Sequence, residues 1–89
     1  MNMEMLDAFM ISVTEGTFQR AADRMGMNTS AVKLAICALE NDLDFTLLKR
    51  GKNIRSVVLT KRGERFYTLV PELRKILQEI EKIRRRGED

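Results

Sequence analysis

Two segments with the apolar spacing of helices flank the tripeptide Gly-Met-Asn at residues 26–28, and this short connection constrains the fold more than any other feature. The first segment, FQRAADRM, contains the small residues Ala21 and Ala22, which leave space for another helix to approach closely. Asn28 can cap the following helix, which is predicted from about Thr29 to Leu43. Two helices joined by so short a turn predict a helix-turn-helix.

Another helix is predicted before this pair, because apolar residues recur at helical spacing from Met3 to Val13. Gly16 can take the left-handed conformation that ends a helix, and Thr17 can cap the next helix, which begins at Phe18. The residues expected to face the core of the three helices are Leu6, Phe9, Met10, Val13, Phe18, Ala21, Ala22, Met25, Val32, Ile36, Leu39 and Leu43.

The apolar residues no longer follow helical spacing in the segment TLLKRGKNIRSVVLT, residues 46–60. An apolar pair, a Gly-Lys-Asn turn region and the β-branched pair Val57 and Val58 predict a short β-hairpin with a basic tip. A hairpin that follows a helix-turn-helix is a wing, here residues 49–59. The predicted fold class is therefore mainly α with a small β-hairpin, a winged helix-turn-helix over residues 1–59.

The last predicted segment, residues 60–89, is a linker or dimerisation helix that Thr60 caps and that ends in a frayed basic tail. Its apolar residues follow the alternating steps of four and three that form a coiled-coil seam, so we expect a partner helix. The alternative is that the stripe packs on its own domain. Pro71 either kinks this helix or begins a new one. The predicted dimer residues are Phe66, Val70, Leu73, Leu77 and Ile80.

Basic residues are concentrated in residues 49–65, which hold seven Lys or Arg against Glu64 alone, a balance of +6. Since the whole chain carries +3, the remainder carries −3. Such an asymmetry favours a surface that faces nucleic-acid phosphates, because each neutralised phosphate releases condensed counterions. On charge alone, a solvated basic loop is the alternative.

Composition argues against several other classes of protein. The chain of 89 residues has one Cys and no His, so the usual zinc, Cys-His and Ser-His sites are excluded. Glu40, Asp42 and Asp44 lie near each other at a helix end without a base or nucleophile and are interpreted as surface acids. No apolar run approaches the roughly 20 residues of a membrane-spanning helix. We expect a cytoplasmic protein with no catalytic function, metal, cofactor or membrane partner.

The run LDAFMISVTEGTFQRAADRMGMNTSAVKLAICALENDL, followed by LLKR and LTKRGERFY, resembles the N-terminal DNA-binding domain of LysR-type transcriptional regulators. The resemblance covers nearly the whole chain. It implies binding to double-stranded DNA at the nucleoid, a homodimer formed through the C-terminal helix, and insertion of the helix at about residues 29–43 into the major groove. LysR-type regulators normally continue into an effector-binding domain, so the chain is interpreted either as a fragment of a longer regulator or as a naturally short protein.

The chain departs from the family where bases are read. Family members commonly begin the recognition helix with Ser-Gln-Pro or Ser-Gln-Ser and place a Ser-Arg pair one turn later, whereas this chain has Asn-Thr-Ser at residues 28–30 and then Lys33 and Leu34. Lys33 can donate to guanine or to phosphate, whereas Leu34 offers only apolar contact, for example with a thymine methyl. We therefore expect target sequences that differ from those of the family.

The predicted DNA contacts fall on three segments. We expect phosphate contacts from the start of the second helix, base contacts from the third helix, and contacts with flanking phosphates or the minor groove from the wing. The alternatives are a capping role alone for Thr17 and a solvated face for the third helix. The predicted set is Thr17, Gln19, Arg20, Asn28, Thr29, Ser30, Lys33, Leu34, Cys37, Arg50, Lys52, Asn53 and Arg55.

Three hypotheses for function follow. The first is a sequence-specific, dimeric regulator of transcription, which predicts binding that weakens steeply with salt. The second is an interaction protein that forms heterodimers with a full-length LysR-type regulator and modulates it. The third is a nonspecific DNA binder that contacts phosphates alone.

Overall fold

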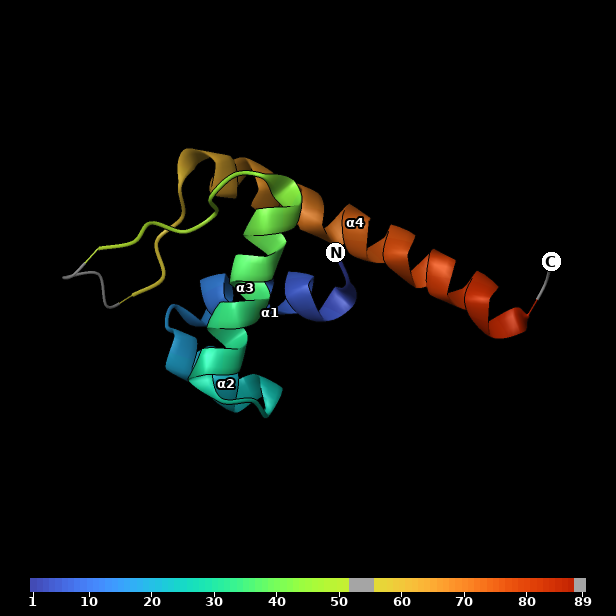
Figure 1. Cartoon of the computed structure of the whole chain (residues 1–89), viewed down its shortest axis with the longest axis horizontal. Coiled ribbons are helices and arrows are strands. Elements are labelled where there is room, and N and C mark those ends of the chain that lie inside the picture. Colours follow the sequence, from blue (N-terminus) through green and yellow to red (C-terminus); the bar gives the residue numbers. More distant parts are fainter. Residues whose placement is uncertain (52–55, 88–89) are drawn as a thin grey trace.

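The computed structural model describes residues 1–51 and 56–87, and within them the chain forms four α-helices (Figure 1). They are α1 (Met3–Glu15), α2 (Phe18–Met25), α3 (Thr29–Leu43) and α4 (Lys61–Arg86). The helix-turn-helix is confirmed, and α2 and α3 begin and end at the predicted residues. The molecule is elongated, with extents of 51 × 27 × 19 Å, because α4 continues well past the other helices.

Local capping explains where the helices begin. The side chains of Asn2, Thr17, Asn28 and Thr60 each accept a backbone N–H three residues further on, at 2.8–3.2 Å. Such bonds satisfy N–H groups that have no partner within the helix. The turn between α2 and α3 is closed by Gly26, whose φ of 67° is a left-handed conformation that costs glycine little.

The core lies where α1 packs against the other three helices. Phe9 of α1 is fully buried and its ring lies 5.8 Å from the ring of Phe66 and 6.0 Å from that of Tyr67, both on α4. Ala21 and Ala22 are buried, as their small size predicted. The buried hydrophobic residues are Leu6, Ala8, Phe9, Ala21, Ala22, Val32, Ile36, Leu39, Leu47, Leu48, Phe66 and Val70.

The predicted β-hairpin is not formed by the described part of the wing. Instead of two strands, one antiparallel bridge joins Leu48 to Leu59. The Thr60 N–H donates to the Leu47 carbonyl at 2.9 Å, and in a longer ladder the Leu47 N–H would donate in return to the Thr60 carbonyl. The Leu47 N–H donates to Glu40 Oε2 instead, and the Thr60 carbonyl accepts the first turn of α4. Competition from the two neighbouring helices therefore limits the pairing.

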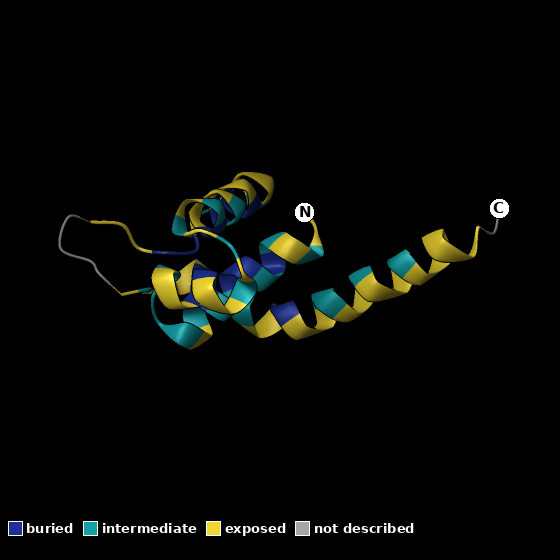
Figure 2. Cartoon of the chain, turned by 90° about the horizontal axis from the view of Figure 1, so that it is seen from below, coloured by how far each residue is buried: buried dark blue, intermediate teal, exposed yellow. Residues whose placement is uncertain are grey.

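Helix α4 passes through Pro71 without interruption, so a second helix does not begin there. The last of its residues buried in the core is Val70, Leu73 and Leu77 are half-buried against that core, and most residues beyond are exposed (Figure 2). The described part of the wing and the C-terminal end of α4 lie at opposite ends of the molecule (Figure 1). The fold thus separates the surface formed by α2, α3 and the wing from the projecting part of α4.

Candidate nucleic-acid interface

The outward face of α3 holds the side chains predicted to contact bases. Ser30, Lys33, Leu34 and Cys37 are exposed, and Thr29 is half-buried. Leu34 is 70% exposed, the largest fraction among the exposed large hydrophobic residues that the structure describes. The opposite face of α3 is buried, so this helix presents one surface that combines a cation, hydroxyl groups and an apolar side chain.

Of the DNA contacts predicted at the start of α2 and at Asn28, just before α3, two residues cap helices and two do not. Thr17 Oγ1 accepts the Arg20 N–H at 3.2 Å, and Asn28 Oδ1 accepts a backbone N–H of α3 at 2.8 Å. Gln19 and Arg20 are exposed, and Arg20 Nε lies 3.7 Å from Glu15 Oε1. Capping is therefore a structural role of Thr17 and Asn28, and the exposed groups here are Gln19 and Arg20.

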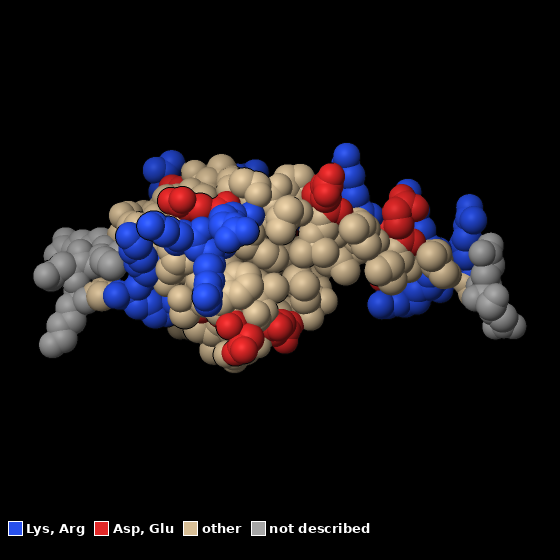
Figure 3. Space-filling view, turned by 90° about the horizontal axis from the view of Figure 1, so that it is seen from above, with Lys and Arg blue, Asp and Glu red and all other residues tan. Residues whose placement is uncertain are grey.

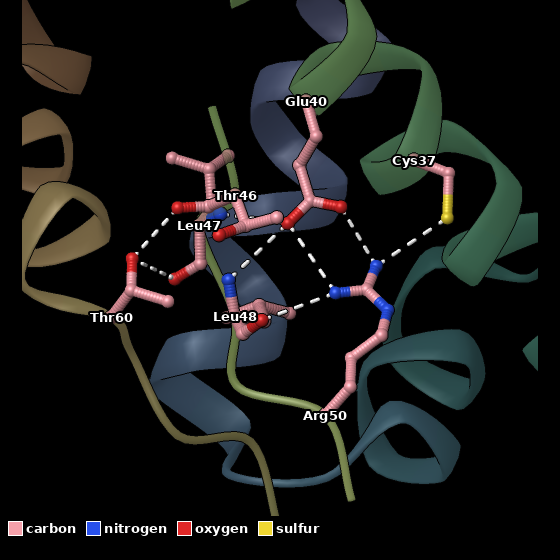
Figure 4. A network of polar contacts seen from close by, with 7 residues as sticks. All are labelled: Cys37, Glu40, Thr46, Leu47, Leu48, Arg50 and Thr60. Carbon is pink, nitrogen blue, oxygen red and sulfur yellow. Dashed lines mark hydrogen bonds and ion pairs between the residues drawn. The ribbon is translucent and has the colours of Figure 1, made fainter. Parts of the chain in front are cut away.

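Glu40 is a correction to the sequence interpretation, which treated it as a surface acid. It is 8% exposed, and its carboxylate accepts the N–H groups of Leu47 and Leu48 at 2.7 and 3.3 Å (Figure 4). The signal was present in the sequence, since helical spacing places position 40 on the same face as Ile36 and Leu39. A buried carboxylate is expected to have several donors, and the wing root, residues 47–50, provides them.

Arg50 completes this network rather than projecting freely. Its Nη2 donates to Glu40 Oε1 at 2.7 Å and to Cys37 Sγ at 3.4 Å, while Nη1 donates to the Leu48 carbonyl at 3.1 Å and to Glu40 Oε2 at 3.4 Å. Hydrogen bonding to Glu40, and secondly to Cys37, raises the pKa of Arg50 above its ordinary value. The network joins α3 to the wing (Figure 4). Of the other predicted wing residues, Lys52, Asn53 and Arg55 lie outside the described residues.

Basic groups also line a cavity of about 230 Å³ between α2, α3 and the wing. Lys33, Lys49 and Arg50 contribute the cations, and Phe18, Ile36 and Leu48 contribute apolar surface. Lys33 Nζ lies 5.4 Å from the centre of the Phe18 ring, within the range of a cation–π contact. Figure 3 shows Lys and Arg side chains gathered at the wing end of the molecule, whereas basic and acidic side chains alternate along the projecting part of α4.

The described ranges 1–51 and 56–87 contain no cluster of His, Cys, Asp or Glu suited to a metal ion. Within the same ranges, no helix has the length and apolar character needed to cross a membrane.

The residues predicted to form the dimer seam take two different positions on α4. Phe66 and Val70 lie in the chain's own core, 7% and 0% exposed. Leu73 and Leu77 are half-buried against that core, and Ile80 is 49% exposed. The alternative interpretation, packing on the same domain, therefore describes the first part of the stripe, because α4 crosses α1 there.

A second apolar stripe on α4 was missed at the sequence level. Leu69, Ile76 and Ile83 are 56%, 56% and 61% exposed and follow one another at intervals of seven residues. With Ile80 they form an exposed seam, defined here as Leu69, Ile76, Ile80 and Ile83. The seven-residue interval was visible in the sequence, but two stripes compete on this helix and spacing alone does not rank them.

Comparison with known proteins identifies the family of this chain. Residues 3–64 match the model of the bacterial regulatory helix-turn-helix proteins of the lysR family. The chain is 37% identical to a probable nitrogen assimilation transcriptional activator of Synechococcus elongatus over 79 residues, which are 89% of this chain. Over the same length it is 35% identical to the HTH-type transcriptional regulator CrgA of Neisseria meningitidis. The aligned residues are 24% and 25% of those relatives, so the chain spans about a quarter of their length.

Solved structures show the same fold. The CbnR DNA-binding domain in complex with DNA aligns with a TM-score of 0.79 at 24% identity, covering 98% of both chains. The BenM DNA-binding domain in complex with benA site 1 DNA aligns with a TM-score of 0.77 at 28% identity, covering 99% of this chain and 100% of that one.

Proposed function

Because this chain belongs to the lysR family of bacterial regulatory helix-turn-helix proteins, we propose that it acts as the DNA-binding domain of a transcriptional regulator and reads duplex DNA with α3. The family consists of regulators rather than enzymes, in agreement with the expectation of no catalytic function. A protein that binds the bacterial chromosome works in the cytoplasm, at the nucleoid.

The outward face of α3 is the observation that carries this proposal. The major groove of B-DNA is about 12 Å wide and admits an α-helix, so a helix with one buried and one exposed face can bring the exposed face to base edges. Ser30 and Lys33 supply hydrogen-bond donors there, and Leu34 supplies an apolar surface of the kind that contacts a thymine methyl. Related domains of the same fold, such as the BenM domain, have been crystallised with DNA.

Phosphate contacts are assigned to the groups that flank α3. At the start of α2 these are Gln19 and Arg20 with the helix N-terminus, and from the wing the proposal keeps the sequence prediction of Lys52, Asn53 and Arg55, which lie outside the described residues. Such contacts add affinity and register rather than sequence preference. Residues 1–59 then form the DNA-binding part, and residues 60–89 form the linker or dimerisation helix.

A homodimer through the projecting part of α4 is part of the proposal. The exposed seam is apolar and would face water in a monomer, which favours its burial against a second helix. Ile80 belongs to this seam, and the half-buried Leu73 and Leu77 lie beside it. Phe66 and Val70 are already buried in their own core, so they support α4 rather than the partner.

The test is titration of the purified chain against the DNA upstream of its own gene and against a scrambled duplex of equal length, at two salt concentrations, with the mass of the free protein measured in parallel. We expect preference for the upstream duplex, weakening with salt and a dimeric mass. Equal binding to both duplexes would indicate a nonspecific binder. Absence of binding, with a mass that shifts only when a full-length relative is added, would overturn the proposal in favour of an interaction protein.

Ser30→Ala and Lys33→Gln test the base contacts of α3, with Asn41→Gln as the matched control. Asn41 is exposed near the C-terminal end of α3 and is outside the proposed contact set. We expect Ser30→Ala and Lys33→Gln to reduce the preference for the upstream duplex and Asn41→Gln to leave it unchanged.

A further inference from the structure

We propose that Arg50 is a positioning residue for DNA binding, which acts through Glu40 to hold the wing root against α3, and that the neighbouring Lys49 makes the phosphate contact at this place. The inference rests on the proposed function and changes the assignment of Arg50, which the sequence placed among the DNA contacts.

The Arg50 guanidinium is already bonded to several acceptors of its own chain. Both terminal nitrogens are within hydrogen-bond distance of Glu40, at 2.7 and 3.4 Å, and each has one further acceptor, Cys37 Sγ or the Leu48 carbonyl. Planar, forked pairing of this kind is specific to arginine, since lysine offers a single point charge. The raised pKa of Arg50 agrees with a guanidinium held by its protein partners.

Release of Arg50 would leave the buried Glu40 carboxylate without its counter-charge. Glu40 is 8% exposed, and its carboxylate has the backbone amides of Leu47 and Leu48 as its other donors. If Arg50 turned toward a DNA phosphate, a buried carboxylate would lose its counter-charge close to the negative DNA backbone, which is strongly unfavourable. Phosphate binding that takes the half-exposed Arg50 side chain away from Glu40 is therefore unfavourable.

The network of Glu40 and Arg50 lies between two surfaces that would contact DNA, the outward face of α3 and the wing. Glu40 lies on α3 two turns after Lys33, and Arg50 ends the wing root. The same short segment is bonded to the other arm of the wing, because the Lys49 N–H donates to the Val58 carbonyl at 2.8 Å. The Glu40–Arg50 pair thus determines how the wing is set relative to the base-reading face of α3.

Lys49 and Arg50 are both exposed and line the same basic cavity, but the charge of Lys49 is not needed to balance Glu40. Lys49 also follows the bridge residue Leu48 directly, so its backbone position is fixed. A long cationic side chain at a fixed backbone position can reach a phosphate without uncovering a buried acid. The Glu40–Arg50 network would then fix the backbone of the wing root, and Lys49 would supply the positive charge that contacts the DNA phosphate.

The first test uses the free protein. Amide hydrogen exchange is compared in the wild type, Glu40→Gln and Arg50→Lys, with the α1 amides as internal reference. We expect faster exchange at Leu47, Leu48 and Lys49 in both variants and unchanged exchange in α1. Unchanged exchange at the wing root would overturn the positioning role. This readout requires no DNA, so it decides the role of the pair even if the wild-type chain binds no duplex, a result that would refute the proposed function separately.

The second test measures affinity for the upstream duplex over a series of salt concentrations. Lys49→Gln should reduce the slope of log affinity against log salt by about 0.9, the value of one phosphate contact. Arg50→Lys and Glu40→Gln should each lower affinity by roughly tenfold, about 1.4 kcal/mol, with the slope unchanged. The two losses should not add in the double variant, because both variants break one pair.

Direct phosphate binding by Arg50 predicts the opposite pattern. Arg50→Lys would then bind DNA almost as well as the wild type, Glu40→Gln would bind equally or more tightly, and Lys49→Gln would leave the slope unchanged. Any of these three results would overturn the corresponding part of the proposal. Lys49→Gln is also the matched control for folding, since it removes a neighbouring charge without leaving a buried acid unpaired.

Discussion

Gly63 offers the sharpest test of how the wing root meets α4. It lies in the first turn of α4, is buried, and has no positive φ, so its backbone conformation suits any residue. The obstacle is space. A Cβ at position 63 would overlap the carbonyl oxygen of Leu47 and would lie 2.9 Å from its carbonyl carbon, and both atoms are backbone. Gly63→Ala therefore requires the Leu47 segment to move away from the helix.

The size of the effect follows from what holds Leu47 in place. Its carbonyl accepts the Thr60 N–H at 2.9 Å and the Thr60 hydroxyl at 3.3 Å, and two such bonds contribute about 1 kcal/mol each. Partial exposure of the fully buried Leu47 side chain costs up to about 2 kcal/mol more. The better helix propensity of alanine offsets about 1 kcal/mol of this loss of stability. The expected net loss in the free energy of unfolding is about 2 to 3 kcal/mol.

Thermal unfolding followed by circular dichroism measures this loss, at equal protein concentration because a dimer makes Tm concentration-dependent. For a domain of this size the loss corresponds to a decrease in Tm of about 10 to 20 °C. The matched control is Thr68→Ala, an exposed position further along α4, which should stay within about 0.5 kcal/mol of the wild type. A Gly63→Ala variant as stable as the wild type would refute the close approach of Leu47 to α4.

Three further predictions address the other surfaces. Leu34→Ala should weaken binding to the upstream duplex about fivefold, or about 1 kcal/mol, without changing Tm, and equal loss on scrambled DNA would contradict a base contact. Ile76→Glu should shift the dimer toward monomer in sedimentation velocity while helix content stays constant, with Gln78→Glu, also exposed, as control. Thr60→Ala should lower stability by about 1 to 2 kcal/mol in denaturant unfolding, because it removes the α4 cap and the bond to the Thr46 carbonyl.

The positions of the helices were predictable because the signals are local. Thr17, Asn28 and Thr60 cap the helices that they were predicted to cap, and Gly16 and Gly26 end helices in left-handed conformations. Capping and helical periodicity act within a few residues, so they can be recognised from the sequence alone. The same locality explains why α3 begins and ends where its sequence indicated and why its outward face could be assigned.

The contacts of Glu40 and the limits of the wing depended on segments that are distant in sequence. A carboxylate at position 40 is interpreted as a surface acid until residues 47–50 supply its donors, and one of these donors, the Leu47 amide, is then lost to the predicted β-ladder. Hydrogen-bond partners are chosen by proximity in the folded chain, and a backbone amide that has two possible acceptors is satisfied by the one the packing brings nearer.

The sequence alone therefore determined the helix-turn-helix, its caps and the basic character of the segment after α3, since each depends on neighbours along the chain. Tertiary structure decided which of the two apolar stripes of α4 is buried. Both stripes have helical spacing, but the packing of α4 on α1 covers Phe66 and Val70 and leaves Leu69, Ile76 and Ile83 exposed. The side of a helix that meets the core is fixed by how that helix packs on its neighbours, which its own spacing does not specify.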